Sequence, residues 1–354
     1  MDLIFGWLRK QFSDPQAVAL AVLLAALLLM VLFFGGYLAP LLAAMVFAYM
    51  LEGSVVRLER LHIHRRWSAL LISNLLIISF LILIFALVPA LMRQAGQFMS
   101  ELPDLVMRSQ AYLMGLTERY PDLFTQAQIN EIVSAAVQDI GSLRKTVLSQ
   151  SLLLGTGLMY VAVYVVLVPL LVYFMLKDKQ RLQAWGRRFV PTQDGLISHV
   201  WHEVDTQLAN YIRGKGVEVL MVWVATYISF ALLGLNYAML LSVLVGVSVL
   251  VPYLGAMAVT IPVAFVAYAQ WGMNADFVYV MLTYLVIQGI DGNIVVPLLF
   301  SEAVDLHPVA IIAAVLFFGG IWGFWGVFFA IPLATVVNAV LRAWPSQKPS
   351  PQLS

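Results

Sequence analysis

The sequence of 354 residues contains no cysteine and has few charged side chains. Without cysteine the chain forms no disulfide bond, offers no thiolate to a metal and has no cysteine nucleophile. Charged residues make up 11% of the chain and hydrophobic residues 62%. Soluble domains have about 25% charged and about 45–50% apolar residues. No soluble fold buries so much apolar surface, so the composition indicates an integral membrane protein.

The sequence motifs of common enzyme classes are also absent. There is no G-x-S-x-G nucleophile elbow, no H-E-x-x-H zinc motif, no P-loop and no dinucleotide-binding fingerprint. His199 and His202 have a spacing compatible with metal binding, but no third ligand accompanies them. The net charge of +1 gives no support for nucleic-acid binding. We therefore expect no enzymatic activity, no cofactor, no metal site and no nucleic-acid partner.

Long apolar runs are the dominant feature that is present, and they predict an all-α polytopic membrane protein. A helix needs about 20 apolar residues to cross the hydrocarbon layer of a bilayer. Residues 17–34 and 70–91 are nearly apolar on every face, unlike the alternating strands of a membrane β-barrel. We expect about eight transmembrane helices in the lipid bilayer of a bacterial inner membrane.

Basic residues in the N-terminal half predict the topology. Residues 1–92 are expected to form a transmembrane hairpin, with a tight turn at residues 35–37, followed by a third span at residues 69–91. The connecting residues 52–67 contain four arginines, which the positive-inside rule places in the cytoplasm. Basic residues near the N-terminus place that end in the cytoplasm as well.

Residues 93–150 form one long polar stretch, which predicts a helical periplasmic insert. Apolar residues recur in it at steps of three and four, namely at Ile129, Ile132, Val133, Ala136, Val137, Ile140 and Leu143. This stripe either packs against a partner helix around Phe98, Leu102 and Val106 or lies along the membrane surface.

The remaining chain divides into four predicted segments. Residues 151–176 form the fourth span, and the basic residues 177–215 form a cytoplasmic amphipathic segment. Residues 216–342 form a transmembrane transport core that has no Lys or Arg between residues 217 and 341. Residues 343–354 form a cytoplasmic tail, so both termini are expected in the cytoplasm.

Glycine and proline interrupt the apolar segments of this core, which predicts broken or re-entrant helices. Non-helical backbone at membrane depth persists only where protein or a water-filled cavity satisfies its hydrogen bonds, so breaks indicate a transport pathway. The residues predicted to break helices or line the pathway are Pro252, Gly255, Pro262, Gly289, Gly292, Pro297, Pro308, Gly320, Gly323, Gly326 and Pro332.

Asp291 is the leading candidate for ion coupling because it interrupts the apolar run of residues 277–300. A carboxylate within the membrane is costly, and residues 217–341 contain no basic residue to neutralise it. It must be protonated, bind a cation, contact water or pair with an arginine from elsewhere. Gln288 and Asn293 are expected to be its neutral partners. The alternative is a protonated carboxyl group with a purely structural role.

Three further ionisable residues of this half are candidates for ion coupling, namely Glu218, Glu302 and His307. Glu302, like Asp276 and Asp305, also fits an ordinary loop position or a helix N-cap.

Four segments of the C-terminal half carry a resemblance to a known family. They are VPYLGAMAVTIP at 251–262, IQGIDGNIVVPLL at 287–299, DLHPVAI at 305–311 and GGIWGFWGVFFAIPLA at 319–334. In this order they resemble the autoinducer-2 exporter family over most of the chain, more loosely before residue 152. The resemblance implies a homo-oligomeric secondary transporter or exporter, with an acidic residue, often Glu, at the position of Asp291. Because some relatives are associated with export of a furanosyl signal and others with sodium–proton exchange, it does not fix the substrate.

Three functions remain open from the sequence. The first is a secondary transporter that exports a small solute and is coupled to protons or sodium. The second is a passive channel formed by an oligomer, and transport against a gradient distinguishes the two. The third is a membrane scaffold that holds a partner through residues 93–150, which co-purification without any flux would indicate.

The topology leads to a labelling prediction, for which the absence of cysteine provides a clean background. Single cysteines at Ser142, Ser198 and Ser346 should react with an impermeant maleimide in intact spheroplasts only at position 142. Labelling at position 198 without lysis would contradict the topology.

Overall fold

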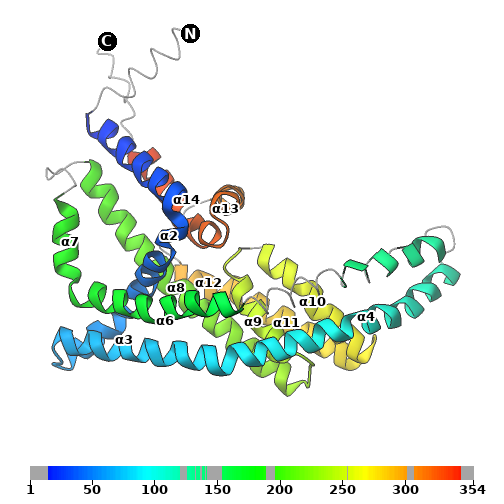
Figure 1. The fold of residues 1–354 in the computed structure, drawn as a ribbon. Coiled ribbons are helices and arrows are strands. Elements are labelled where there is room, and N and C mark those ends of the chain that lie inside the picture. The colour runs from blue at the N-terminus through cyan, green and yellow to red at the C-terminus, as the bar shows by residue number, and fades with distance from the viewer. Residues whose placement is uncertain are drawn as a thin grey trace, which may run out of the picture.

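The computed structural model is helical throughout the part of the chain that it describes (Figure 1). It describes residues 15–119, 126–131, 133–135, 138–139, 141, 154–188, 196–252, 254–300 and 307–343. Five helical segments there are long and apolar enough to cross a membrane, namely Tyr37–Arg60, Arg65–Pro103, Asp205–Leu232, Leu254–Trp271 and Ala275–Phe300. Four apolar helices are shorter, namely Val163–Lys177, Ala238–Ser248, Pro308–Trp322 and Phe324–Thr335. The all-α polytopic prediction is confirmed.

The first helix, α2 (Pro15–Arg60), passes through residues 35–37 without a turn, so the predicted hairpin at this position is wrong. Its 46 residues span roughly 70 Å, about twice the hydrocarbon thickness of a bilayer. Pro40 lies inside the helix, and the axis changes direction partway along its length (Figure 1). Glycine does not end a helix where the surroundings offer the backbone no other hydrogen-bond partners.

The third predicted span continues into the predicted insert without a break. The helix α3 (Arg65–Ile82), the π-helix η1 (Leu83–Leu87) and α4 (Val88–Arg119) follow one another directly and form the long helix at the bottom of Figure 1. A π-helix inserts an extra residue into a turn without ending the helix. The predicted boundary at residues 92 and 93 is therefore not a boundary in the fold.

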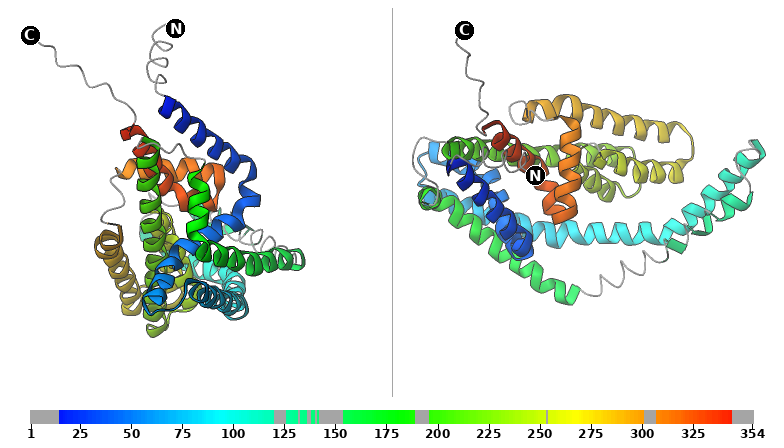
Figure 2. Two further views of the ribbon diagram at one scale, coloured as in Figure 1. Left: turned by 90° about the vertical axis from the view of Figure 1, so that its left-hand side faces the viewer. Right: turned by 90° about the horizontal axis from the view of Figure 1, so that it is seen from above.

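The insert is a helical hairpin in its described part. Helical residues between 126 and 141 lie beside the end of α4 (Figures 1 and 2). Ile129 and Val133 of the apolar stripe are buried, which favours packing over a position on the membrane surface. The other residues of the stripe lie outside the described residues.

The N-terminal part of α4, residues 94–101, packs against the core helices and not against the rest of the insert. Phe98 makes an edge contact with Tyr237, with ring centroids 5.3 Å apart, so the predicted pairing of Phe98 with the stripe is not the contact observed. The Tyr237 hydroxyl donates to the Glu101 carboxylate at 2.6 Å, and the Gln94 side-chain oxygen accepts from the Leu240 backbone nitrogen at 2.9 Å. Burial and the Glu101 carboxylate raise the pKa of Tyr237, which keeps its hydroxyl protonated as a donor.

Ion pairs join the ends of α2, α3 and the next helices, α6 (Leu154–Lys177) and α7 (Lys179–Arg187). Arg65 contacts Glu52 at 3.0 Å and donates to the Leu176 backbone oxygen at 2.8 Å. Lys179 contacts the same Glu52 at 3.0 Å. The two basic segments that are predicted to be cytoplasmic therefore lie side by side.

The helix α8 (Leu196–Leu232) begins in the predicted cytoplasmic segment and runs into the predicted core. It is followed by a hairpin of two helices, α9 (Ala238–Ser248) and α10 (Leu254–Trp271). With 11 residues, α9 is roughly 16 Å long and too short to cross the hydrocarbon layer. Leu250, at the tip of the hairpin, packs in one apolar cluster with residues of α8, α13 and α14. A broken segment is thus confirmed between α9 and α10.

The remaining helices are less interrupted than predicted. The helix α11 (Ala275–Ile290), the π-helix η2 (Asp291–Val295) and α12 (Val296–Phe300) form one helical run, and α13 (Pro308–Trp322) and α14 (Phe324–Ala343) follow. Three predicted breaks are real: the α9–α10 tip at Pro252 and Gly255, the start of α13 at Pro308, and Gly323 between α13 and α14.

The other predicted breaks are wrong as interruptions of helix. Pro262, Gly289, Gly292, Pro297, Gly320, Gly326 and Pro332 all lie within helical segments. Gly326 instead lets two helices approach, because an added Cβ would lie 1.8 Å from the Phe318 backbone oxygen of α13. Small residues commonly allow such close helix packing in membranes.

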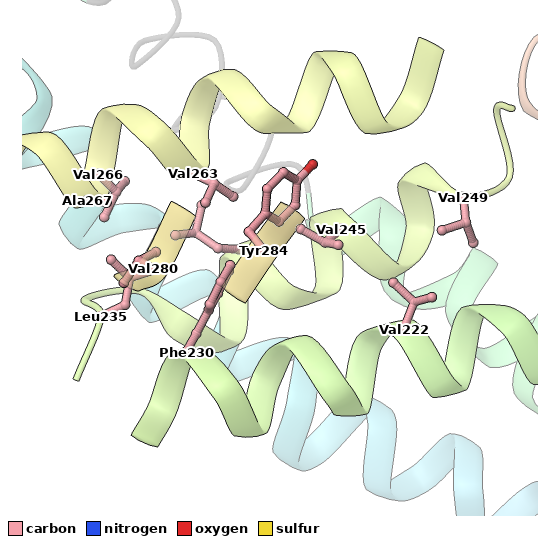
Figure 3. Packing of buried hydrophobic residues seen from close by; sticks show 11 residues of the cluster. Val222, Phe230, Leu235, Val245, Val249, Val263, Val266, Ala267, Val280 and Tyr284 are labelled. Carbon is pink, nitrogen blue, oxygen red and sulfur yellow. The ribbon is translucent and has the colours of Figure 1, made fainter. Parts of the chain in front are cut away.

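A buried apolar cluster joins α8, α9, α10 and α11 (Figure 3). It includes Val222, Phe230, Val245, Val263, Val280 and Tyr284. Gly246 brings α9 against α8, because an added Cβ there would lie 2.7 Å from Trp223 Cβ. The cluster holds the α9–α10 hairpin against α8.

Gly255 provides a test of the hairpin. A Cβ at this position would lie 1.8 Å from the Ser248 backbone oxygen, which cannot move without shifting the end of α9. We expect Gly255→Ala to destabilise the protein by about 1–3 kcal/mol, as overpacking does in other interiors. Thermal unfolding of the purified protein in detergent measures the effect.

The matched control is Gly96→Ala, because Gly96 is also helical and an added Cβ there meets nothing within 4 Å. Equal melting temperatures for the two variants would contradict the close contact at Gly255.

Candidate functional site

Lys215, Glu218 and Asp291 form a buried charged cluster at the junction of α8, the tip of the α9–α10 hairpin and η2. The Lys215 Nζ lies 2.9 and 2.8 Å from the two carboxylate oxygens of Glu218. It also donates to the Val249 backbone oxygen at 2.8 Å. Lys215, Glu218 and Asp291 are only 4%, 1% and 9% exposed. Charges buried to this degree are rare unless they are paired.

Local structure explains each position in the cluster. Lys215 and Glu218 are three residues apart on α8, so their side chains share one face of the helix. Val249 caps the C-terminal end of α9, where backbone carbonyls lack partners within the helix. A cation at a helix C-terminus is also favoured by the helix dipole. Lys215 therefore satisfies both a carboxylate and the end of the short helix.

Asp291 is the second carboxylate of the cluster and is the first residue of η2. It interacts electrostatically with both Lys215 and Glu218. Its Oδ1 is buried and has no hydrogen-bond partner in the part of the chain that the structure describes. One ammonium group thus faces two carboxyl groups, and the cluster carries one excess negative charge unless a proton or another cation joins it. Such a charge is expensive in a low-dielectric interior.

Aromatic side chains cover the cluster. The Lys215 Nζ lies 5.4 Å from the centre of the Phe300 ring, a cation–π distance. Gly214 allows this ring to approach, because an added Cβ would lie 2.7 Å from it. Tyr211 packs on Phe300 and donates from its hydroxyl to the Phe328 backbone oxygen at 3.2 Å. This apolar cover reduces the access of water and strengthens the electrostatic interactions inside.

The two residues predicted to be neutral partners of Asp291 have other partners. The Gln288 side chain donates to the Tyr284 hydroxyl at 3.1 Å. The Asn293 side chain is exposed and donates to the Gly289 backbone oxygen at 2.8 Å. Neither forms a hydrogen bond with Asp291 among the described residues. Gln288 lies three residues before Asp291 but is held by Tyr284, and Asn293, two residues after it, lies on another side of the helical run.

The remaining ionisable candidates fall into two groups. Glu218 is in the cluster, whereas His307 caps the N-terminus of α13, where its Nδ1 accepts from the Val309 backbone nitrogen at 3.2 Å. His307 thus has the structural role of an N-cap. Glu302 lies outside the described residues.

The predicted pathway residues are only partly brought together. Pro252 and Gly255 flank the hairpin tip, next to Val249 and hence next to the cluster. Gly289, Gly292 and Pro297 lie on the same helical run as Asp291. The other predicted residues lie on α10, α13 and α14, namely Pro262, Pro308, Gly320, Gly323, Gly326 and Pro332.

Lys215 is the functional candidate that the sequence analysis missed. It lies two residues before the stretch without Lys and Arg and was assigned to the cytoplasmic segment. A signal was nevertheless present: Lys215 and Glu218 are oppositely charged, three residues apart, and lead directly into the apolar residues 219–233. Such a pair at the start of a span indicates mutual neutralisation.

Known proteins resemble the whole chain. Residues 20–346 match the family described as AI-2E family transporter. The chain is 44% identical over 345 residues to the Escherichia coli (strain K12) protein named "Putative permease PerM", and the match covers 98% of each chain.

More distant relatives also cover most of the chain. A Bacillus subtilis protein named "Putative transport protein YueF" is 27% identical over 310 residues, which are 85% of this chain and 82% of that one. A Methanothermobacter thermautotrophicus protein named "Putative transport protein" is 24% identical over 313 residues, which are 84% and 86% of the two chains. The predicted resemblance is confirmed, and the chain belongs to the AI-2E transporter family.

Proposed function

We propose that the protein is a secondary transporter that exports a small solute across the bacterial inner membrane and is coupled to a cation at the Lys215–Glu218–Asp291 cluster. The observation that carries the proposal is a buried carboxyl oxygen of Asp291 without a partner among the described residues, in a cluster whose lysine holds the tip of an interrupted helical hairpin. Ionisable residues inside transmembrane segments commonly mark ion pathways and proton relays. Membership of a transporter family agrees with this role.

The hairpin tip gives the cluster a means of controlling the protein's conformation. Lys215 holds the end of α9 through the Val249 backbone oxygen and holds Glu218 at the same time. A change in the charge of the cluster changes the free energy of this anchor. If two positions of the tip differ in their affinity for the cation, the cation shifts the equilibrium between them, which is the requirement for coupled transport.

The passive channel and the scaffold remain alternatives, and the fold sharpens their tests. Deleting all of residues 93–150 would remove Gln94 and Glu101, which contact the core. A deletion for the scaffold test must therefore begin after Pro103. If the protein is a transporter, the shortened chain should still catalyse flux, whereas a scaffold would lose its partner. A homo-oligomer is expected in either case.

Asp291→Asn tests the proposed function because it keeps the shape of the side chain and removes its charge. In proteoliposomes that contain a panel of small organic solutes, wild-type protein should move one of them against its gradient when a proton or sodium gradient is imposed. The asparagine variant should lose this uphill transport, while Asp291→Glu should keep part of it with an altered ion dependence. Solute content measured by mass spectrometry reports the result.

The matched control is Asp276→Asn, which replaces an exposed carboxylate at the start of α11 and should transport normally. Full uphill transport by Asp291→Asn would contradict a coupling role for Asp291. Wild-type flux that only ever runs downhill would instead indicate a channel.

A further inference from the structure

We infer that the coupling ion is a proton and that Lys215 is a resident counter-ion, which occupies the place that a metal cation would take. This inference rests on the proposed coupled transporter and specifies its ion. It follows from two observations: Lys215 already occupies the oxygens of Glu218 and Val249, and the charges of the cluster do not balance.

A sodium ion would need several oxygen ligands directed at one point, such as carboxylates and the carbonyls at helix ends. The oxygens that converge here are the two of Glu218 and the backbone oxygen of Val249, and all three lie 2.8–2.9 Å from the Lys215 Nζ. The Gly289 backbone oxygen accepts from Asn293.

The charges of the cluster leave room for one proton. Lys215 neutralises Glu218, with which it shares two short contacts. Asp291 remains with a buried oxygen that has no hydrogen-bond partner among the described residues. A single proton on the carboxyl groups makes the cluster neutral. Release of that proton leaves a buried negative charge, which favours a conformation that exposes the site to water.

The charged groups that interact electrostatically with Asp291 are Lys215 and Glu218 on α8, where Tyr211 lies one turn before Lys215. On α11 the ionisable side chain that most closely precedes Asp291 in sequence is Tyr284. The Tyr284 hydroxyl is held by the Ala256 backbone oxygen and by Gln288. The neighbouring α12 has no ionisable side chain. The charge of Asp291 therefore depends mainly on how Lys215 is shared between the two carboxyl groups.

This sharing gives an unusual prediction for Glu218→Gln. Once Glu218 is neutral, Lys215 is available to neutralise Asp291, and the proton is no longer needed. Infrared difference spectra of the purified protein should show the carbonyl stretch of a protonated carboxylic acid at neutral pH in the wild type. The band should disappear in Asp291→Asn and also in Glu218→Gln, although Glu218→Gln leaves Asp291 unchanged.

Two further variants serve as controls. In the double variant Lys215→Met with Glu218→Gln, Asp291 again lacks a counter-ion, so the band should return. Replacing a buried ion pair by neutral groups of similar size is often tolerated, so this variant should fold. In Asp276→Asn the band should persist, because that carboxylate is exposed. A band that survives Asp291→Asn, or that survives Glu218→Gln, would overturn the inference.

Thermal unfolding of the wild type provides the second arm and does not depend on any variant. A ligand that binds only the folded state raises the melting temperature. Because we expect no sodium or lithium site, replacing choline by either ion at constant ionic strength should leave the melting temperature unchanged. A sodium-specific increase would overturn the proton inference but leave the transporter proposal intact. The expected infrared bands without any uphill solute transport would count against the proposed function and not against the proton site.

Discussion

The ammonium group of Lys215 holds together three parts of the protein that its backbone connects only through long detours. Lys215 pairs with Glu218 on its own helix, α8, and donates a hydrogen bond to Val249 at the end of α9. Its charge also interacts with Asp291 on η2. Within a membrane protein such an interaction is strong because charges are weakly screened, and for the same reason an unpaired charge is costly. The surroundings screen charges weakly, so every group must be balanced, and any change of one proton is felt by all of them.

The fold around this cluster follows from the behaviour of backbone in an apolar environment. Helices continue through glycine and proline because lipid and neighbouring side chains offer the backbone no better hydrogen bonds. This explains why Gly289, Gly292 and Pro297 remain in a helical run that changes only to a π-helix at Asp291. The chain breaks instead at the tip between α9 and α10, where the start of α10 lies so close to the end of α9 that position 255 has no room for a Cβ.

Composition alone was enough to predict a helical membrane protein, and the C-terminal motifs were enough to predict its family. The sequence also made Asp291 a candidate and predicted the break at Pro252 and Gly255, because a carboxylate and a proline stand out against an apolar run. The turn predicted at residues 35–37 is wrong. Glycine favours turns in loops exposed to water, but in an apolar environment the need to satisfy backbone hydrogen bonds keeps the chain helical.

The partners of Asp291 were not predictable from the sequence. Gln288 and Asn293 are close to it along the chain, but contacts between helices are decided by packing, and packing brought in Lys215 from 76 positions earlier. A tally of charges within residues 217–341 missed this lysine because the range began two residues after it. A segment boundary drawn from composition does not show which side chains contact one another across it.

The uninterrupted run of α3, η1 and α4 has a mechanical consequence. A continuous helix is stiff over its length, so it acts as a lever whose outer arm is the insert. Its inner arm is fastened to the α8–α9 turn and to the start of α9 through Gln94, Phe98 and Glu101. Lys215 holds the C-terminal end of α9 through the Val249 backbone oxygen. A load applied to the insert would therefore reach the charged cluster through this one short helix. In the proposed transporter, a force on the insert would thus change the free energy of proton release at the cluster.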